Sequence, residues 1–183
     1  MGEFIVSLAV AALVVGTAFG CTGKTVDTEG SGNMGGITQT QGEKIDFDVV
    51  TLRESGMVAE ESMYELKSDG KGGVIISQYL GRWRFDDTVA LEDCVIRRAV
   101  GGAELYEKAA KLLGECNISD WSGFTGYNPN VLDGISFTFE AKLSDGKTVY
   151  ASGSNAFPEN YHKLNSDIYT LLEEYGEEIP RKQ

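Results

Sequence analysis

The stretch that decides the fold is "ISFTFEAKLSDGKTVYASGS" at residues 135–154. Its first nine residues alternate strictly between apolar and polar side chains. A period of two is typical of a strand with one buried face and one wet face. After the polar "SDGK", the segment "TVYASGSN" at 148–155 alternates again. The stretch therefore predicts a β-hairpin in a sheet that is covered on one side. The apolar face of its first strand comprises Ile135, Phe137, Phe139, Ala141 and Leu143.

The register of the two strands fixes the length of the loop that joins them. A two-residue turn at 145–146 would pair Lys142 with Val149 and so mix the buried and exposed faces, which the pleat forbids. A three-residue loop at 144–146 pairs Ala141 with Val149 instead, and the apolar faces agree. The last residue of this loop is a glycine, which adopts the required left-handed conformation without penalty. We therefore predict the three-residue loop.

A nearly identical string, "YELKSDGK", occupies 64–71. It predicts a second hairpin within 57–85, with one strand on either side of "SDGKGG". We interpret Ser-Asp-Gly-Lys as the same turn in both hairpins. The alternative is an internal duplication, because each half of the chain reads as a hairpin followed by a helix.

Two amphipathic helices and one further strand complete the predicted domain. Apolar residues from Leu105 to Cys116 form one stripe of a helix at about 102–115, and a second stripe from Tyr161 to Tyr175 follows Pro158. The segment 45–53 alternates like a strand, and 86–100 is ambiguous, although "DCVIRRAV" at 93–100 could be another short strand. We expect an α+β fold of two layers: a mainly antiparallel sheet of about four to five strands, in the order hairpin, helix, hairpin, helix, with both helices on one face.

The N-terminal region has the composition of a targeting segment. Phe4 to Phe19 is almost wholly apolar but too short for a comfortable membrane span, so we interpret 1–20 as a signal peptide. The following "AFGC" at 18–21 resembles the lipobox of bacterial lipoproteins, in which the cysteine is lipidated and becomes the N-terminus. This resemblance implies a lipid on Cys21. An uncleaved anchor, or a plain signal peptide with an incidental cysteine, is the alternative.

The rest of the chain divides into a tether and one domain. Residues 21–44 contain six glycines and little that could pack, so we expect a flexible tether between the lipid and a globular domain at 45–183. The net charge of −12 argues against nucleic acid as a partner, because phosphate binding needs a basic surface. We expect an extracytoplasmic protein that is attached to the bacterial cell membrane through Cys21.

The cysteine and histidine content argues against a metal site or another cofactor. Apart from Cys21 the chain has Cys94 and Cys116, which form a disulfide outside the membrane or remain as two buried thiols. The only histidine is His162, and no pair of cysteines has the spacing of zinc ligands.

The candidate binding loop is "SDWSGFTGYNPNVLDG" at 119–134. Aromatic residues on a glycine-rich loop could stack on sugars or bind a peptide. The alternative interpretation is that Trp121 and Phe124 pack at one end of the core. In that case Tyr127 and Asn128 are the residues expected at the surface.

The C-terminal half resembles an uncharacterised class of domains in secreted or lipid-anchored proteins of Gram-positive, often gut-dwelling, bacteria. The motifs that carry the resemblance are "WSGF" at 121–124, "LDG" at 132–134, "LSDGK" at 143–147 and "GSNAFPENY" at 153–161. The resemblance covers about a third of the chain. It implies a location in the cell envelope and assigns no activity or site residues.

These patterns favour a non-catalytic lipoprotein whose domain binds an envelope protein, a peptide or a glycan. No nucleophile with a plausible base appears in the sequence, so we predict that the protein is not an enzyme. The alternatives are a structural or assembly subunit with no small ligand, and an extracytoplasmic hydrolase.

Overall fold

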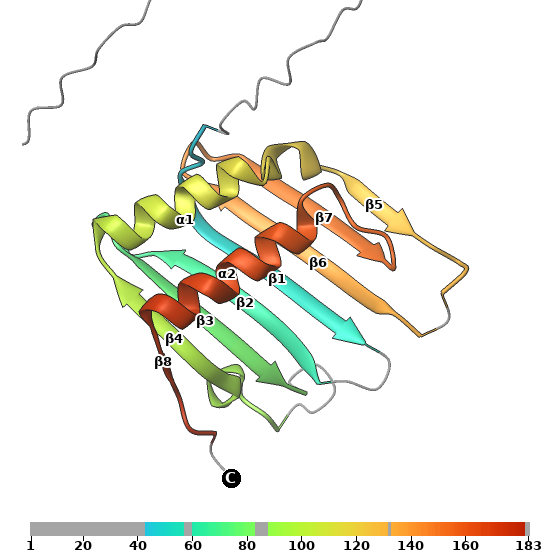
Figure 1. Ribbon diagram of the computed structural model, residues 1–183, viewed down its shortest axis with the longest axis horizontal. Coiled ribbons are helices and arrows are strands. Elements are labelled where there is room, and N and C mark those ends of the chain that lie inside the picture. The colour runs from blue at the N-terminus through green and yellow to red at the C-terminus, as the bar shows by residue number, and fades with distance from the viewer. Residues whose placement is uncertain (1–42, 57–59, 83–87, 132, 182–183) are drawn as a thin grey trace, which may run out of the picture. The chain divides into compact units, whose positions relative to one another are not determined.

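The computed structural model describes residues 43–56, 60–82, 88–131 and 133–181. Their centre is one eight-stranded sheet in the order β5-β7-β6-β1-β2-β3-β4-β8, and helices α1 and α2 lie across one of its faces (Figure 1). Every neighbouring pair is antiparallel except β5 and β7, which are parallel, so the sheet is mixed. The helices are α1, Ala103–Glu115, and α2, Tyr161–Tyr175; the strands are β1, Phe47–Gly56, β2, Glu61–Ser68, β3, Val74–Gly81, β4, Val95–Gly101, β5, Phe124–Tyr127, β6, Ile135–Leu143, β7, Thr148–Ser154, and β8, Gly176–Glu178.

The predicted β6–β7 hairpin is confirmed, including its register. Ala141 lies opposite Val149, and the Leu143 N–H donates to the Lys147 carbonyl oxygen over 2.8 Å. Gly146 has a φ of 88°, the left-handed value that the three-residue loop requires. The alternating apolar residues of β6 from Phe137 to Leu143 are buried as predicted, whereas Ile135 lies exposed at the end of the strand.

The prediction of a four- to five-stranded sheet in hairpin-helix-hairpin-helix order was wrong. The sheet has eight strands, and the second hairpin does not simply follow the first helix, because the 3₁₀ helix η2, Ile118–Trp121, and strand β5 intervene. Strands β5 and β8 have four and three residues, which is too short for alternation to show. A parallel partner for β7 cannot be inferred from a local hairpin pattern either.

The second hairpin also departs from its prediction. Ser68 pairs with Val74, so the loop between β2 and β3 spans the five residues 69–73. The Asp69 carboxylate accepts hydrogen bonds from two backbone N–H groups in this loop, at 2.7 and 2.8 Å. These two bonds lower the pKa of Asp69. The extra glycines at 72 and 73 allow this wider loop, so the two Ser-Asp-Gly-Lys strings do not form the same turn.

Strand β1 carries an irregularity that shifts its buried face. Phe47 and Val50 are both buried, because the register of β1 against β6 shifts between Phe47 and Val49. An extra residue at a bulge moves the later side chains to the opposite face. Leu52 therefore points into the core, and the simple alternation that the sequence suggested for 45–53 stops at Phe47.

The main core lies between the helices and the sheet. The helical stripes contribute Leu105, Ala109, Leu113, Leu164 and Ile168, all of which are buried. At about 25 cal/mol for each Å² of apolar surface removed from water, this layer supplies most of the stabilisation of the domain. A smaller cluster of Met63, Tyr79, Cys94 and Val95 is separate from it.

One polar group enters the helix-covered layer. Glu54, near the end of β1, accepts a hydrogen bond from the Tyr161 hydroxyl at 2.7 Å and one from the Asn165 amide at 2.8 Å. Tyr161 is 1% exposed, so its hydroxyl depends on this partner. Burial and this hydrogen bond raise the pKa of Tyr161. The three side chains attach α2 to the central strand.

Candidate functional site

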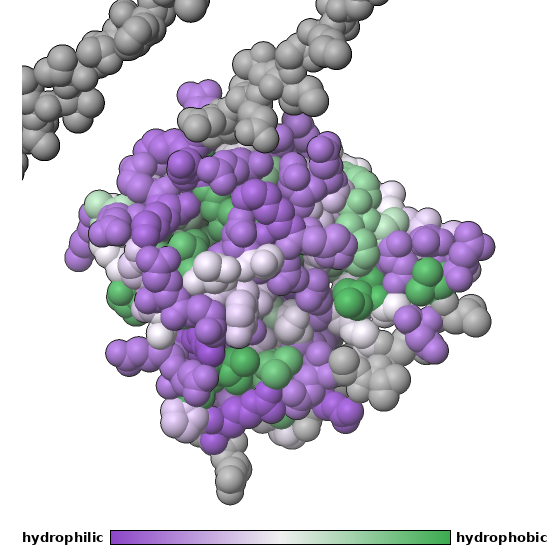
Figure 2. Space-filling model, in the orientation of Figure 1, coloured by the Kyte–Doolittle hydropathy of each residue, from purple (hydrophilic) through white to green (hydrophobic). Residues whose placement is uncertain are grey.

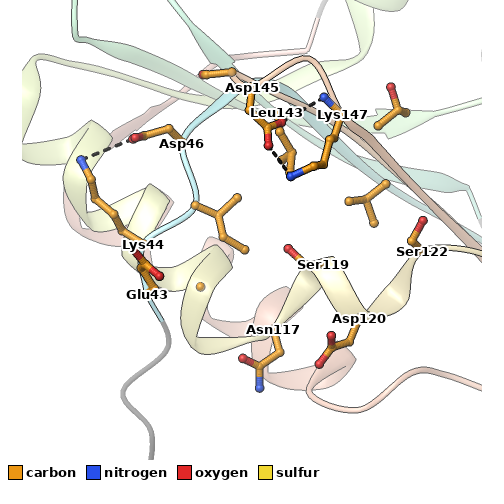
Figure 3. Close-up of a pocket in the computed structure, with 15 residues that line it drawn as sticks. Glu43, Lys44, Asp46, Asn117, Ser119, Asp120, Ser122, Leu143, Asp145 and Lys147 are labelled. Carbon is orange, nitrogen blue, oxygen red and sulfur yellow. Dashed lines mark hydrogen bonds and ion pairs between the residues drawn. The ribbon is translucent and has the colours of Figure 1, made fainter.

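A large hollow lies between the tip of the β6–β7 hairpin, the segment before β1, and η2 (Figure 3). Its volume is about 730 Å³, within the usual range of ligand pockets. Ile45, Leu143 and Val149 are its large apolar lining residues. Ser119, in η2, and Ser122, just after it, line the hollow (Figure 3). The rest of its lining is polar and charged.

The two lysines of this hollow are paired with carboxylates beside them. Lys147 Nζ lies 2.6 Å from Asp145 Oδ2, and Lys44 Nζ lies 3.4 Å from Asp46 Oδ1 (Figure 3). The hydrogen bond from Lys147 lowers the pKa of Asp145, and the same contact raises the pKa of Lys147. The described lining therefore presents no unpaired lysine to an anionic ligand.

The nucleophiles and bases that the described residues bring to this hollow include serines and carboxylates. Among the described residues that line it there is neither a histidine nor a cysteine. The Ser144 hydroxyl donates to Asp48 Oδ1 over 3.4 Å, and Lys147 is engaged with Asp145. Across the described part of the chain, no group of three His, Cys, Asp or Glu side chains could hold a metal ion.

Trp121 and Phe124 are part of the core and do not form a binding loop. Trp121 is 2% exposed, its ring packs edge-on against Phe139 at 4.9 Å, and its indole N–H donates to the Glu159 carbonyl oxygen over 3.0 Å. Phe124 packs against Phe137, with ring centroids 6.2 Å apart. Trp121 therefore closes the end of the core, and Phe124 packs half-buried against it.

Tyr127 and Asn128, the other two candidates, stand at the end of β5. The side chain of Tyr127 is 73% exposed, the largest exposure among the big apolar residues of the described chain. Asn128 is held by its backbone, since its N–H donates to the Ser154 carbonyl oxygen over 3.0 Å. Its side-chain oxygen accepts a bond from the N–H of Asn130. The structure therefore keeps Tyr127 as a surface group and uses Asn128 to shape the turn beside it.

Further apolar side chains are exposed in the same half of the sheet. Val131 and Ile135 are 42% and 47% exposed, and both of their carbonyl oxygens accept hydrogen bonds from Asn155. Tyr150, on β7, is 49% exposed. Four of the six large apolar residues that are exposed in the described chain thus lie in β5, β6, β7 or the connection at 128–134. Figure 2 shows a mainly hydrophilic surface over the helices, with apolar residues at its borders, including the border near β5.

The two edges of the sheet differ in how they are protected. At one edge, β8 carries Glu177 and Glu178 and is followed by Pro180, and charge and proline both discourage a further strand. At the other edge, β5 reads Phe-Thr-Gly-Tyr and lies at the border of the sheet in Figure 1. No charged residue occurs from 121 to 131. We call the outer side of β5, together with Tyr127, the β5 edge. Sequence reasoning missed it, because four residues are too few to show a strand.

The charged residues nearest the β5 edge in the sequence are carboxylates. Between 112 and 141 the chain has four carboxylates and no lysine or arginine, and between 148 and 162 it has one carboxylate and no lysine or arginine. One of the four, Glu115, is paired with Lys163 at 3.4 Å and with Lys111 at 3.6 Å, so the remaining carboxylates set the charge at this edge. Asp120 and Glu159 line a small hollow together with Phe124, at the start of β5. Asp133 follows the strand, and Glu140 lies opposite Tyr150 on the neighbouring pair β6–β7. The edge is thus neutral and is framed by negative charge.

The cysteine pair that was considered for a disulfide is not brought together. Cys94 and Cys116 are both free and both buried, and they belong to two separate apolar clusters. Burial raises the pKa of Cys116 to about 11 and also raises the pKa of Cys94. Both residues behave as small apolar side chains in their clusters.

The chain matches no family model, no curated protein and no solved structure. Three predictions lie outside the described residues: the signal peptide at 1–20, the lipid on Cys21, and all but the last two residues of the tether at 21–44. In the described residues, no helix is long and apolar enough to cross a membrane.

Proposed function

We propose that this protein is a non-catalytic binding domain, displayed outside the bacterial membrane on a lipid at Cys21, and that it binds a partner protein at the β5 edge. One observation carries the binding site: β5 is an open, uncharged edge strand with Tyr127 exposed beside it. Natural proteins usually block such edges, as this chain does at β8, so an unblocked edge marks a docking site.

The structure favours a protein or peptide partner over a glycan. Recognition of a sugar usually relies on aromatic rings that stack on its faces. Trp121 and Phe124 would be the rings for that purpose, but they pack in the core. What stays at the surface is one exposed tyrosine beside a strand edge, which suits backbone hydrogen bonding to an extended chain.

Support for the envelope location comes from the sequence. The apolar run at 4–19, the lipobox-like "AFGC", and the resemblance of the C-terminal half to domains of secreted or lipid-anchored proteins all favour it. A glycine-rich tether of about two dozen residues would let the domain reach partners near the membrane surface.

The test places a photo-crosslinking amino acid in the full chain in its native host, at Tyr127 in one strain and at Tyr169 in another. Tyr169 is the matched control because it is also a tyrosine, is 43% exposed and lies on α2. We expect a discrete crosslinked species from position 127 and none from 169. Equal labelling at both positions, or none at 127, would refute the proposed surface. Intact mass of the membrane fraction tests the anchor: a chain that begins at Cys21 with added diacylglyceryl is expected.

A further inference from the structure

We infer that the partner docks by adding a strand to the outer side of β5, and that this strand is uncharged in its middle and carries lysine or arginine at its ends. This inference rests on the proposed function and specifies the chemistry of the partner. Three features of the described residues support it: the rigidity of β5, the alternation of its side chains, and the sign of the surrounding charge.

Strand β5 is fixed at both ends before any partner arrives. The Gly123 N–H donates to the Tyr150 carbonyl oxygen over 2.9 Å, and the Asn128 N–H donates to the Ser154 carbonyl oxygen over 3.0 Å. Between them, Phe124 packs against the core. A template that is already in strand conformation loses little entropy when a second chain pairs with it. Its four residues span about 13 Å, which an added segment of four to six residues would cover.

The side chains of β5 define what an added strand would meet. Phe124 turns toward the helix-covered core, so Thr125 and Tyr127 lie on the opposite face of the sheet, and both are exposed. Cross-strand pairs of an aromatic with a β-branched residue are among the more stabilising pairs in sheets. A partner strand would therefore place a β-branched or other apolar residue opposite Tyr127.

The negative charge near the β5 edge determines which residues are favoured at the two ends of the partner strand. Asp120 and Glu159 lie near the start of β5, and Asp133 lies beyond its end. No lysine or arginine in the surrounding segments 112–141 and 148–162 offsets them. Basic residues at both ends of an added strand would meet carboxylates, whereas acidic residues would be repelled.

The same charges argue against a second copy of this chain as the occupant. A symmetric pairing of two β5 strands would bring the carboxylates of both copies together, and each chain already carries a net charge of −12. Like charges across an edge pair are destabilising. The complementary occupant is a different chain with a basic character.

The test measures binding of three synthetic eight-residue probes to the full chain by fluorescence polarisation. The first alternates threonine and valine with a lysine at each end, the second has glutamate at each end, and the third has lysine ends and a proline in the middle. We expect the lysine-ended probe to bind about tenfold more tightly than the glutamate-ended one. Raising the salt to 0.5 M should reduce this ratio. The proline probe should not bind, because it cannot continue the ladder.

Two variants assign the binding to the edge. Thr125→Lys places a charge on β5 itself and should weaken the lysine-ended probe at least tenfold. Thr148→Lys is the matched control, since it adds the same charge to an exposed strand residue at the β6–β7 hairpin and should leave binding unchanged. Slower amide exchange at 124–127 on addition of the lysine-ended probe would support pairing with this strand.

The outcomes separate this inference from the proposed function. Crosslinking at Tyr127 together with equal affinity for all three probes, or with no effect of Thr125→Lys, would overturn strand addition and leave the binding surface standing. Absence of crosslinking at Tyr127 would overturn the binding surface itself. A concentration-dependent dimer that Thr125→Lys abolishes would show that the edge is occupied by a second copy, and would also overturn the inference.

Discussion

The hydrogen bond between Tyr161 and Glu54 offers the sharpest test of how α2 is held on the sheet. Tyr161→Phe removes only the hydroxyl that donates to Glu54 over 2.7 Å. The ring keeps its contacts with Phe137 and Phe157, whose centroids lie 4.6 and 4.7 Å away. The change therefore isolates the polar interaction from the packing of the aromatic group.

Its magnitude follows from the charge of the acceptor and the burial of the donor. Hydrogen bonds to a charged group contribute about 1.5–3 kcal/mol, roughly twice the value for neutral pairs. Glu54 would keep only the bond from Asn165, so we expect Tyr161→Phe to lower the free energy of unfolding by about 2 kcal/mol. For a domain of this size that corresponds to a melting temperature lower by about 6–12 °C.

The assay is urea and thermal unfolding followed by circular dichroism at pH 7. Tyr169→Phe is the control, because Tyr169 lies on the same helix, is partly exposed, and keeps its ring under Arg97 after the change. We expect that control within about 0.5 kcal/mol of the natural chain. A loss below about 0.5 kcal/mol for Tyr161→Phe would refute the role assigned to the Glu54 contact.

Three further changes test other parts of the structure. Burial raises the pKa of Tyr64 to about 12 and also raises the pKa of Tyr161, so both stay protonated in the folded chain while an unfolded tyrosine ionises near pH 10. Stability should therefore be full below pH 10 and fall above it, and a urea midpoint that is constant from pH 8 to 11.5 would contradict this. Gly114→Ala would place a Cβ 2.0 Å from the Glu43 carbonyl oxygen. We expect this clash to lower the free energy of unfolding in urea by about 1–3 kcal/mol. An unchanged free energy of unfolding would mean that the segment before β1 is not fixed there. Cys116 is buried and its pKa is raised to about 11, so it should resist alkylation at pH 8 until urea is added. The assay reads alkylation by peptide mass. Rapid labelling of the native chain would disprove the burial of Cys116.

The sequence located the long strands and helices, although it gave the wrong turn for the β2–β3 hairpin. The alternation of β6 and the position of Gly146 predicted the β6–β7 hairpin with its register, and the two helical stripes located α1 and α2 to within a few residues. For the candidate site it predicted that Tyr127 would be exposed, and it left open whether Trp121 belonged to the surface or to the core. The structure decides for the core.

The strands at the two borders needed the tertiary structure. β5 and β8 are too short to carry a period, and each forms only because a distant strand, β7 or β4, offers it a hydrogen-bonding partner. The bulge near Val49 likewise depends on pairing with β6. β5 and β8, together with β4, which the sequence left ambiguous, raise the sheet from the predicted four to five strands to eight.

The sequence by itself determined most of the local elements and the acidic charge, because periodicity and charge are properties of neighbouring residues. Only the tertiary structure decided which strands lie at the edges of the sheet, that Cys94 and Cys116 belong to separate clusters, and that β5 is a neutral edge strand with carboxylates near its start. Those properties depend on contacts between residues far apart in the chain, and no local pattern specifies them.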